Sequence, residues 1–185
     1  MDVSIQPDGL VLLLPDPVTC FSDAAYNQIQ VFRLEEGASV VILDWLTSGR
    51  MSRGEEWMFS RYYSVNEVWL GKKRIVRDAM LLEEDPAVRR TLKDRMSIYS
   101  CYATLILYGP KVHTLMEMLL KEYEGYSIYQ HKIPSEFLWT ISNISGGGVV
   151  RIAGKNTEDV KQWLRTHVSV LSEHVGTDVL SNAFL

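Results

Sequence analysis

The side chains best suited to chemistry lie between residues 44 and 57, where carboxylates, arginines and glycines separate two apolar runs. Asp44 and Glu55 could act together as an acid and a base, or supply oxygen ligands to a cation. Alternatively, these carboxylates form ion pairs with Arg50 and Arg53 and hold a tight turn closed. The stretch has no nucleophile paired with a base, so it lacks the parts of a covalent catalytic centre.

Gly49 and Gly54 lie in the same stretch, and glycine tolerates both a positive φ and the close approach of another backbone segment. Strand-like apolar runs precede and follow it, at residues 39–46 and 57–63. The pattern therefore predicts a structured polar turn between two strands of a β layer.

The composition is that of an ordinary globular protein. The chain has 185 residues, of which 46% are hydrophobic and 23% are charged, which predicts a single domain. The net charge of -4 gives no reason to expect a nucleic-acid partner. No apolar run reaches the ~20 residues of a membrane span. Cys20 and Cys101 do not make a disulfide framework, so a cytoplasmic location is expected.

The first half of the chain predicts strands, because short β-branched and aromatic runs alternate with turn residues. The predicted strands are residues 10–14, 28–31, 39–46, 57–63, 65–70 and 74–82. Pro15 and Pro17 end the first strand, since proline has no N–H to donate to a sheet. Gly71-Lys72-Lys73 predicts a hairpin turn. Strands spaced about ten residues apart predict stacked antiparallel layers.

The second half adds helices to further strands. Two main helices are predicted at residues 110–125 and 157–175, each with one apolar stripe, together with strands at 100–108, 137–144 and 149–153. Asn156 is expected to cap the start of the last helix, and Gly125 and Gly176 to end the two helices. A short helix is expected after Asp85 and Pro86, and a surface loop at residues 121–132.

The resulting prediction is a β-rich α+β fold of stacked antiparallel layers with two main helices toward the C-terminus. Residues 1–84 form the β layers of one domain, residues 85–176 an α+β part, and residues 177–185 a loose tail.

Other candidate sites have simpler interpretations. His167 and His174 are seven residues apart on one helix, about 10 Å, which is too far for one metal ion. Gly154-Lys155 follows a strand as in a phosphate-binding loop, but five residues separate it from Gly148, and Asn156 replaces the required Ser or Thr. A hydrolase using scattered Ser, His and Asp residues is left open, because triads are not local in sequence.

Three blocks of the sequence, in this order, resemble the urease accessory protein D family (UreD, also called UreH). The first block comprises Leu14-Pro15-Asp16-Pro17-Val18, Cys20-Phe21 and Tyr26-Asn27-Gln28. The second comprises Gly49-Arg50 and Arg53-Gly54-Glu55, and the third is residues 71–82 with Arg77-Asp78. The sequence resembles the C-terminal two thirds of such proteins, which carry a glycine-rich segment and further β layers upstream. Without those layers, the strands at 10–14 and 39–46 would have exposed edges, and we expect poor expression of the isolated chain.

The resemblance implies a helicoid of two β layers with no catalytic activity of its own. It implies a chaperone complex with UreF and UreG, in which UreG carries nickel, UreF bridges and UreD contacts apo-urease. It also implies that nickel passes through an internal channel and that no cofactor is bound stably.

The leading hypothesis is a non-enzymatic scaffold in which Asp44 and Glu55 contact nickel transiently, while Arg50 and Arg53 are structural. Oxygen ligands suit an ion that must also leave. The alternative is a binding module that contacts UreF but does not support nickel transfer.

Overall fold

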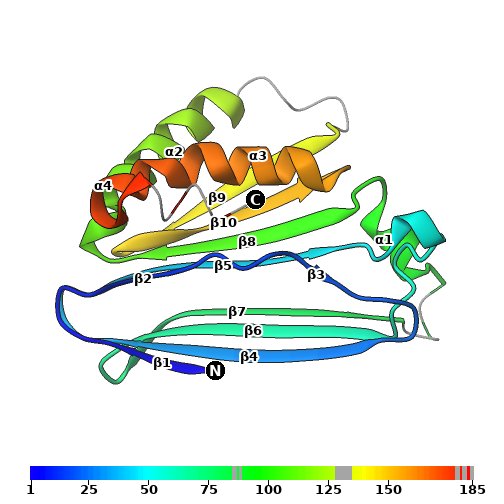
Figure 1. Cartoon of the computed structure of the whole chain (residues 1–185), viewed down its shortest axis with the longest axis horizontal. Coiled ribbons are helices and arrows are strands. Elements are labelled where there is room, and N and C mark those ends of the chain that lie inside the picture. The colour runs from blue at the N-terminus through cyan, green and yellow to red at the C-terminus, as the bar shows by residue number, and fades with distance from the viewer. Residues whose placement is uncertain (85–86, 88, 128–134, 178–179, 181–182, 184–185) are drawn as a thin grey trace.

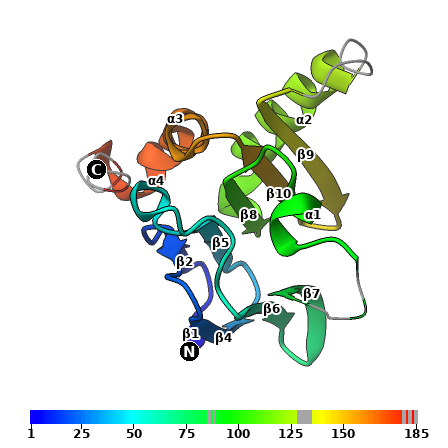
Figure 2. The same ribbon diagram turned by 90° about the vertical axis from the view of Figure 1, so that its right-hand side faces the viewer.

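The computed structural model describes residues 1–84, 87, 89–127, 135–177, 180 and 183. Two β-sheets pack face to face, and the helices α2 and α3 lie on the outer side of one of them (Figure 1). The view turned by 90° shows the same order of layers (Figure 2). The predicted β-rich α+β class is confirmed.

The first sheet has four strands and the second sheet six. The first sheet has the order β1 (Asp2–Ile5), β4 (Ala25–Leu34), β6 (Arg61–Leu70), β7 (Lys73–Glu83). The second has the order β2 (Leu10–Leu13), β5 (Ser39–Thr47), β8 (Cys101–Tyr108), β10 (Gly147–Gly154), β9 (Phe137–Ile144), with β3 (Val18–Thr19) also on β5. Strands from both halves of the chain therefore share the second sheet.

The sheets are mixed, which corrects the prediction of purely antiparallel layers. β1, β4 and β6 run parallel to one another, whereas β6 and β7 form an antiparallel hairpin at Gly71. The reason is the route of the chain. After β4 the chain crosses to the second sheet to form β5, and then returns to the first sheet as β6 in the direction of β4.

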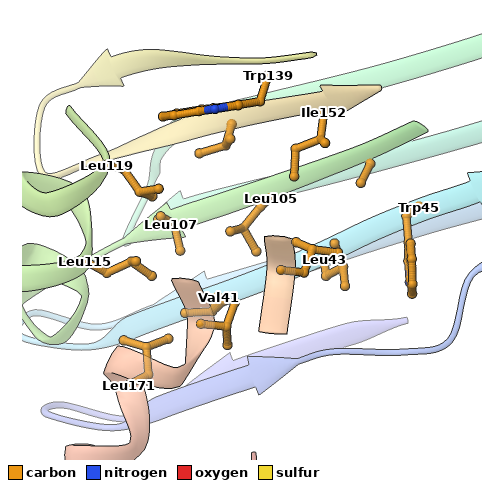
Figure 3. Close-up of a cluster of buried hydrophobic side chains, with 14 of the residues drawn as sticks. Val41, Leu43, Trp45, Leu105, Leu107, Leu115, Leu119, Trp139, Ile152 and Leu171 are labelled. Atoms are coloured by element: carbon orange, nitrogen blue, oxygen red, sulfur yellow. The ribbon is translucent and has the colours of Figure 1, made fainter. Parts of the chain in front are cut away.

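Helices α2 (His113–Ser127) and α3 (Thr157–Val168) cover the outer face of the second sheet. A 3₁₀ turn at Pro110–Val112 precedes α2, and Ser169–Leu171 and α4 (Ser172–Val175) follow α3. The core between helices and sheet contains Val41, Leu43, Trp45, Leu105, Leu107, Leu115, Leu119, Trp139, Ile152 and Leu171 (Figure 3). The apolar stripes predicted for both helices are thus the buried stripes.

The helix boundaries agree with the prediction in part. Asn156 caps α3 by accepting from the Asp159 amide, and Gly176 follows α4 with φ +85°. α2 continues past Gly125 to Ser127, because a glycine inside a helix costs only about 1 kcal/mol relative to alanine. The surface loop predicted at residues 121–132 therefore begins as helix, and its residues 128–132 lie outside the described residues.

Two further boundaries differ from the prediction. The short helix α1 (Leu92–Met96) is capped by Thr91 in a reciprocal box with Asp94, while Asp85 and Pro86 lie outside the described residues. The strand predicted from residue 57 begins only at Arg61, because Trp57 has φ +56°, which no regular strand contains.

None of the helices in the described ranges is long and apolar enough to cross a membrane. Of the tail predicted as loose, only residues 177, 180 and 183 are described.

Candidate functional site

The space between the two sheets changes character along the strands. One end is an apolar, mainly aliphatic cluster that includes Val40, Val68 and Ile106 together with Phe32. The opposite end is rich in aromatic side chains. Polar side chains occupy the level between them, where a sandwich would ordinarily place apolar ones. That interruption is the most distinctive feature of the interior.

Two facing rows of residues make up this level, and we call them the polar layer. The strand registers align Gln30, Asn66 and Asp78 across the first sheet. They align Asp44, Thr104 and Arg151 across the second sheet. Gln30, Asn66, Asp78 and Thr104 are all buried. The polar layer therefore crosses the sandwich at right angles to its strands.

Asp44 is the charged centre of the polar layer. Its carboxylate accepts hydrogen bonds from Tyr62 Oη at 3.1 Å, Ser64 Oγ at 2.5 Å and Asn66 Nδ2 at 2.6 Å. These donors are neutral groups of β6, not the arginines that the sequence pattern favoured. Burial, and then the nearby Asp44 carboxylate, raise the pKa of Tyr62, so this phenol stays protonated and donates.

Two oxygen atoms beside this centre lack a hydrogen-bond partner among the described residues. They are Gln30 Oε1 and Asn66 Oδ1, and both are fully shielded from solvent. A buried acceptor without a donor costs about 1–3 kcal/mol. The polar layer therefore offers free oxygen atoms to a donor or a cation, next to the carboxylate of Asp44.

A hydrogen-bonded chain extends from Asp44 along β4. Ser64 Oγ, which donates to Asp44, accepts from Gln28 Nε2 at 3.4 Å, and Gln28 Oε1 accepts from Tyr26 Oη at 2.6 Å. Gln28, singled out in the first sequence block, thus supports the polar layer from the neighbouring row.

At the edge formed by β7 and β10, the polar layer reaches the surface. Arg151 Nη2 donates to Asp78 Oδ1 at 2.6 Å, and the Arg151 side chain is 54% exposed against 10% for Asp78. Arg77 lies on the opposite face of β7 and pairs with Glu67 at 3.3 Å. The motif Arg77-Asp78 is therefore split, because successive residues of a strand point to opposite faces.

At the opposite edge of the second sheet, the strand pairing with β5 is interrupted at the level of Asp44. β2 pairs with β5 as far as Ile42, and β3 resumes the pairing at Leu46. Residues 15–17, the Pro-Asp-Pro motif, lie in this interruption, and the Pro15 carbonyl accepts from Trp45 Nε1 at 2.8 Å. The first sequence block therefore lies beside the polar layer.

The turn from Gly49 to Glu55 is separate from the polar layer. Arg50 Nε and Nη2 donate to the two Glu55 carboxylate oxygens at 2.8 and 2.7 Å, as the ion-pair interpretation predicted. The Ser22 amide also donates to Glu55, at 3.1 Å. The hydrogen bond from Arg50, followed by that from the Ser22 amide, holds the pKa of Glu55 below its usual range.

Both glycines of this turn have the positive φ that was expected. Gly49 has φ +126°, and a Cβ there would lie 2.1 Å from the Glu55 carbonyl oxygen. Gly54 has φ +75° and ends a 3₁₀ turn, Met51–Arg53, in which Arg53 is exposed. Glu55 and Asp44 share none of their hydrogen-bond partners, so the structure gives the two carboxylates separate environments.

The remaining candidates have structural roles. His167 is buried, and its Nε2 lies 2.9 Å from Glu122 Oε2. Cys20 and Cys101 are buried free thiols, and burial raises the pKa of Cys101 to about 12. His131 lies outside the described residues, and the described part of the chain contains no group of three or more His, Cys, Asp or Glu side chains that could hold a metal ion.

Sequence reasoning missed most of the polar layer. A signal was present in β6, where Tyr62, Ser64 and Asn66 recur at every second position and so share one face. The sequence pattern does not show that this face of β6 is turned toward Asp44.

Comparisons with known proteins agree with the resemblance of the three sequence blocks. The chain is 32% identical to urease accessory protein D of Oryza sativa subsp. indica over 95% of this chain and 64% of the relative. It is 35% identical to urease accessory protein 4 of Cryptococcus neoformans, over 89% of this chain and 55% of the relative. It is 36% identical to UreD of Sorangium cellulosum, over 96% of this chain and 55% of the relative. The chain therefore spans less than two thirds of the length of these relatives. The family model of the UreD urease accessory protein matches residues 1–182, and the chain belongs to this family.

Proposed function

We propose that the protein is a non-enzymatic accessory scaffold that supports nickel insertion into apo-urease, together with UreF-type and UreG-type proteins. Membership of the UreD family supports the role in urease maturation. The observation that carries the finer proposal is the polar layer, with the Asp44 carboxylate and two unpartnered buried oxygens in an otherwise apolar interior.

The donor chemistry of the polar layer suits an ion in transit. Carboxylate and amide oxygens are hard ligands that bind a first-row divalent ion less firmly than a cluster of imidazoles or thiolates does. Bringing a divalent ion between two sheets is costly unless a negative charge and oxygen ligands compensate it. Asp44 supplies the charge, and Asn66 Oδ1 and Gln30 Oε1 supply oxygens without breaking a hydrogen bond within the described chain.

Asp44 is a better supported nickel contact than Glu55. Both carboxylate oxygens of Glu55 already accept hydrogen bonds from Arg50, and the ion pair stabilises the turn. An ion passing Glu55 would compete with a bidentate guanidinium. We therefore assign the transit step to Asp44 and the polar layer, and a structural role to Glu55.

The test is urease activation in cells that co-express urease and its accessory proteins with either the wild-type chain or Asp44→Asn. This substitution keeps the side-chain shape, and the Asn66 amide can rotate to present its oxygen to the new NH₂ group. We expect at least a tenfold loss of nickel bound to purified urease, measured by mass spectrometry, with the scaffold still co-purifying with apo-urease. Glu35→Gln, which removes an exposed carboxylate from the turn between β4 and β5, is the matched control.

Full nickel loading by Asp44→Asn would reject the polar layer as the route. The scaffold proposal would be rejected if the wild-type chain co-purified neither with apo-urease nor with either of the two accessory proteins. If the wild-type chain binds the UreF-type protein but never supports nickel loading, the binding-module alternative holds instead.

A further inference from the structure

The polar layer contains a second carboxylate besides Asp44. Asp78 of β7 is buried, and the strand register places it directly beside Asn66 of β6. Asn66 donates from Nδ2 to Asp44, and its Oδ1 has no hydrogen-bond partner among the described residues. Oxygen ligands of the kind that a divalent ion accepts therefore follow one another from the β7 edge to the charged centre of the polar layer.

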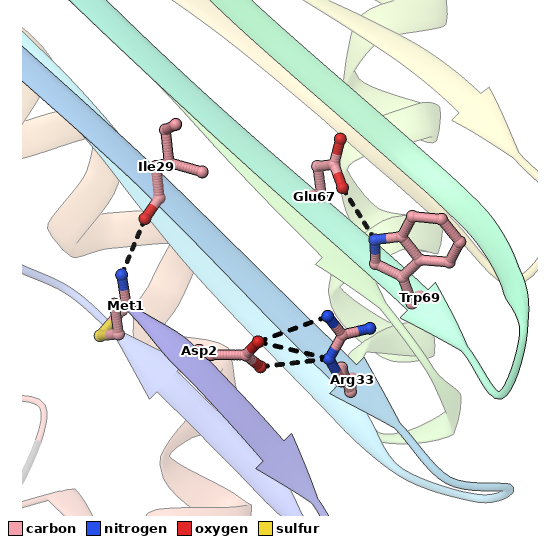
Figure 4. Close-up of polar contacts among 6 residues, drawn as sticks. All are labelled: Met1, Asp2, Ile29, Arg33, Glu67 and Trp69. Atoms are coloured by element: carbon pink, nitrogen blue, oxygen red, sulfur yellow. Dashed lines mark hydrogen bonds and ion pairs between the residues drawn. The ribbon is translucent and has the colours of Figure 1, made fainter.

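The two partners of the ion pair at this edge differ in their exposure to solvent. Arg151 Nη2 donates to Asp78 Oδ1 at 2.6 Å, but 54% of the Arg151 side chain is exposed against 10% of the Asp78 side chain. The pair between Arg33 of β4 and Asp2 of β1 is different, because both of its side chains are more than half exposed (Figure 4). Arg151 can therefore turn toward the solvent, where its charge is hydrated, while β7 holds Asp78 in the interior.

The charge of the polar layer depends on where the Arg151 guanidinium lies. The aligned residues of the layer include three charged side chains, Asp44, Asp78 and Arg151, which together carry one negative charge. A divalent ion that enters beside the guanidinium leaves an excess of one positive charge between the sheets. If the guanidinium turns outward, the ion and the two carboxylates neutralise one another. Because uncompensated charge in a protein interior is costly, arrival of the ion favours departure of the guanidinium.

The same competition favours divalent over monovalent ions. Na⁺ or K⁺ carries no more charge than the guanidinium and cannot donate the hydrogen bond that Asp78 accepts from Arg151. Replacing the guanidinium by such an ion therefore brings no stabilisation. A divalent ion carries twice the charge, and its Coulomb attraction to the two carboxylates doubles accordingly. Arg151 thus retains Asp78 in the presence of monovalent ions and releases it to a divalent one.

We propose that Arg151 is an exchangeable counter-ion, which holds Asp78 until the divalent ion in transit takes its place. The hydrogen bond from Arg151 Nη2 to Asp78 Oδ1 breaks, the guanidinium turns outward, and the freed carboxylate oxygen binds the ion. Asn66 Oδ1 and the Asp44 carboxylate lie next along the layer. The role of Arg151 rests on the proposed function for the identity of the ion, nickel, and makes this residue the control of its passage at the edge formed by β7 and β10.

The first measurement is the affinity of the purified, tag-free chain for Ni²⁺, by competition with a chromophoric chelator. Arg151→Met removes the charge and leaves Asp78 free for the ion, so we expect roughly tenfold tighter binding. Asp78→Asn removes the carboxylate, and we expect roughly fivefold weaker binding. Arg77→Met is the matched control, since Arg77 is 44% exposed and pairs with Glu67 on the opposite face of β7. It should change the affinity by less than about twofold.

The second measurement is delivery of nickel to urease in the co-expression assay described above. Arg151→Met should leave roughly threefold less nickel on purified urease, because an ion held by two uncompensated carboxylates leaves the polar layer more slowly. Binding and delivery thus change in opposite directions, whereas loss of a merely structural ion pair would weaken both. Arg151→Lys keeps the positive charge, and we expect it to restore most of the wild-type affinity and delivery.

A further variant keeps the test decisive if Arg151→Met does not fold. Arg151→Gln removes the charge but retains a neutral N–H donor for Asp78, so the carboxylate is not left without a hydrogen bond. The expected changes have the same directions as for Arg151→Met. Melting curves without metal identify the variants that are folded, and only these enter the comparison. Ni²⁺ bound at exposed His113 is common to all of them and cancels between variants.

The outcomes separate the role of Arg151 from the proposed function. A folded Arg151→Met or Arg151→Gln chain that binds Ni²⁺ no more tightly than the wild type would overturn the exchange, while a loss of delivery by Asp44→Asn would still support transit through the polar layer. Tighter binding with undiminished delivery would place the ion at Asp78 outside the route, and would also overturn it. Full delivery by Asp44→Asn would reject the transit route itself, and the role of Arg151 with it.

Discussion

Asp44 of the second sheet and Asn66 of the first meet across the sandwich, with Asn66 Nδ2 2.6 Å from Asp44 Oδ2. The bond joins the two sheets through their interiors, between an apolar cluster on one side and the Gln28–Ser64 row with an aromatic-rich cluster on the other. It therefore links the stability of the fold to the same side chains that we propose for nickel transit.

Replacing Asp44 should reveal this link. Asp44→Leu leaves Tyr62, Ser64 and Asn66 with buried donors and no acceptor, and we expect a loss of about 3 kcal/mol or more in the free energy of unfolding. Asp44→Asn retains an acceptor and should lose about half as much or less. Urea denaturation measures both, and equal losses would show that the donors find other partners.

The glycine turn makes a second prediction. Gly49→Ala places a Cβ 2.1 Å from the Glu55 carbonyl oxygen and also strains a φ of +126°, so the backbone must move. We expect a loss of at least 2 kcal/mol in the free energy of unfolding. Gly54→Ala meets no atom within 4 Å and strains only φ, so about 1 kcal/mol is expected from thermal denaturation. The opposite order would contradict the turn geometry.

The ion pair of the turn should make stability depend on pH. The pKa of Glu55 is lowered in the folded chain, first by the hydrogen bond from Arg50, so its stabilisation is present above the unfolded pKa of about 4.3. It is lost as the pH falls through the lower folded value. Arg50→Met should flatten this part of the stability curve below about pH 4.3, as measured by denaturant midpoints at several pH values. An unchanged acid limb in the variant would contradict the assignment.

The two cysteines should resist alkylation in the folded chain. Burial raises the pKa of Cys20 and brings that of Cys101 to about 12, so few thiolates form near neutral pH. We expect iodoacetamide to label both thiols slowly at pH 8 and rapidly in denaturant, with Cys101 the slower in the folded state. Mass spectrometry of timed samples gives the two rates. Fast labelling of Cys101 without denaturant would mean that β8 opens readily.

The local elements of the fold were predictable because each has its own signal. The apolar run at Ser39–Thr47, the hairpin at Gly71 and the cap at Asn156 all follow from residue type and spacing. The end of α2 could not be predicted in this way. Glycine often ends a helix, but Gly125 lies inside this one. The sequence-based prediction placed Trp57 in a strand, because a tryptophan gives no indication of a positive φ.

The polar turn was predictable and the polar layer was not, for a physical reason. Arg50 and Glu55 are close in sequence, so their pairing needs only a tight bend. Asp44 and Asn66 meet only because β5 and β6 enter different sheets, which depends on the path of the whole chain. Arg151 joins Asp78 from 73 residues away, and no local pattern connects them.

The route of the chain through β4, β5 and β6 has a consequence for how the molecule assembles. Since β5 separates two strands that are adjacent in the first sheet, β4 and β6 cannot pair as a simple hairpin and must close a loop around a strand of the other sheet. Closing a loop of this length costs conformational entropy before the stabilising contacts between β4 and β6 form. It therefore slows folding. Nascent chains that stop before β6 would expose β4 along a whole edge, so the interval before β6 emerges from the ribosome is when this protein most needs protection from aggregation.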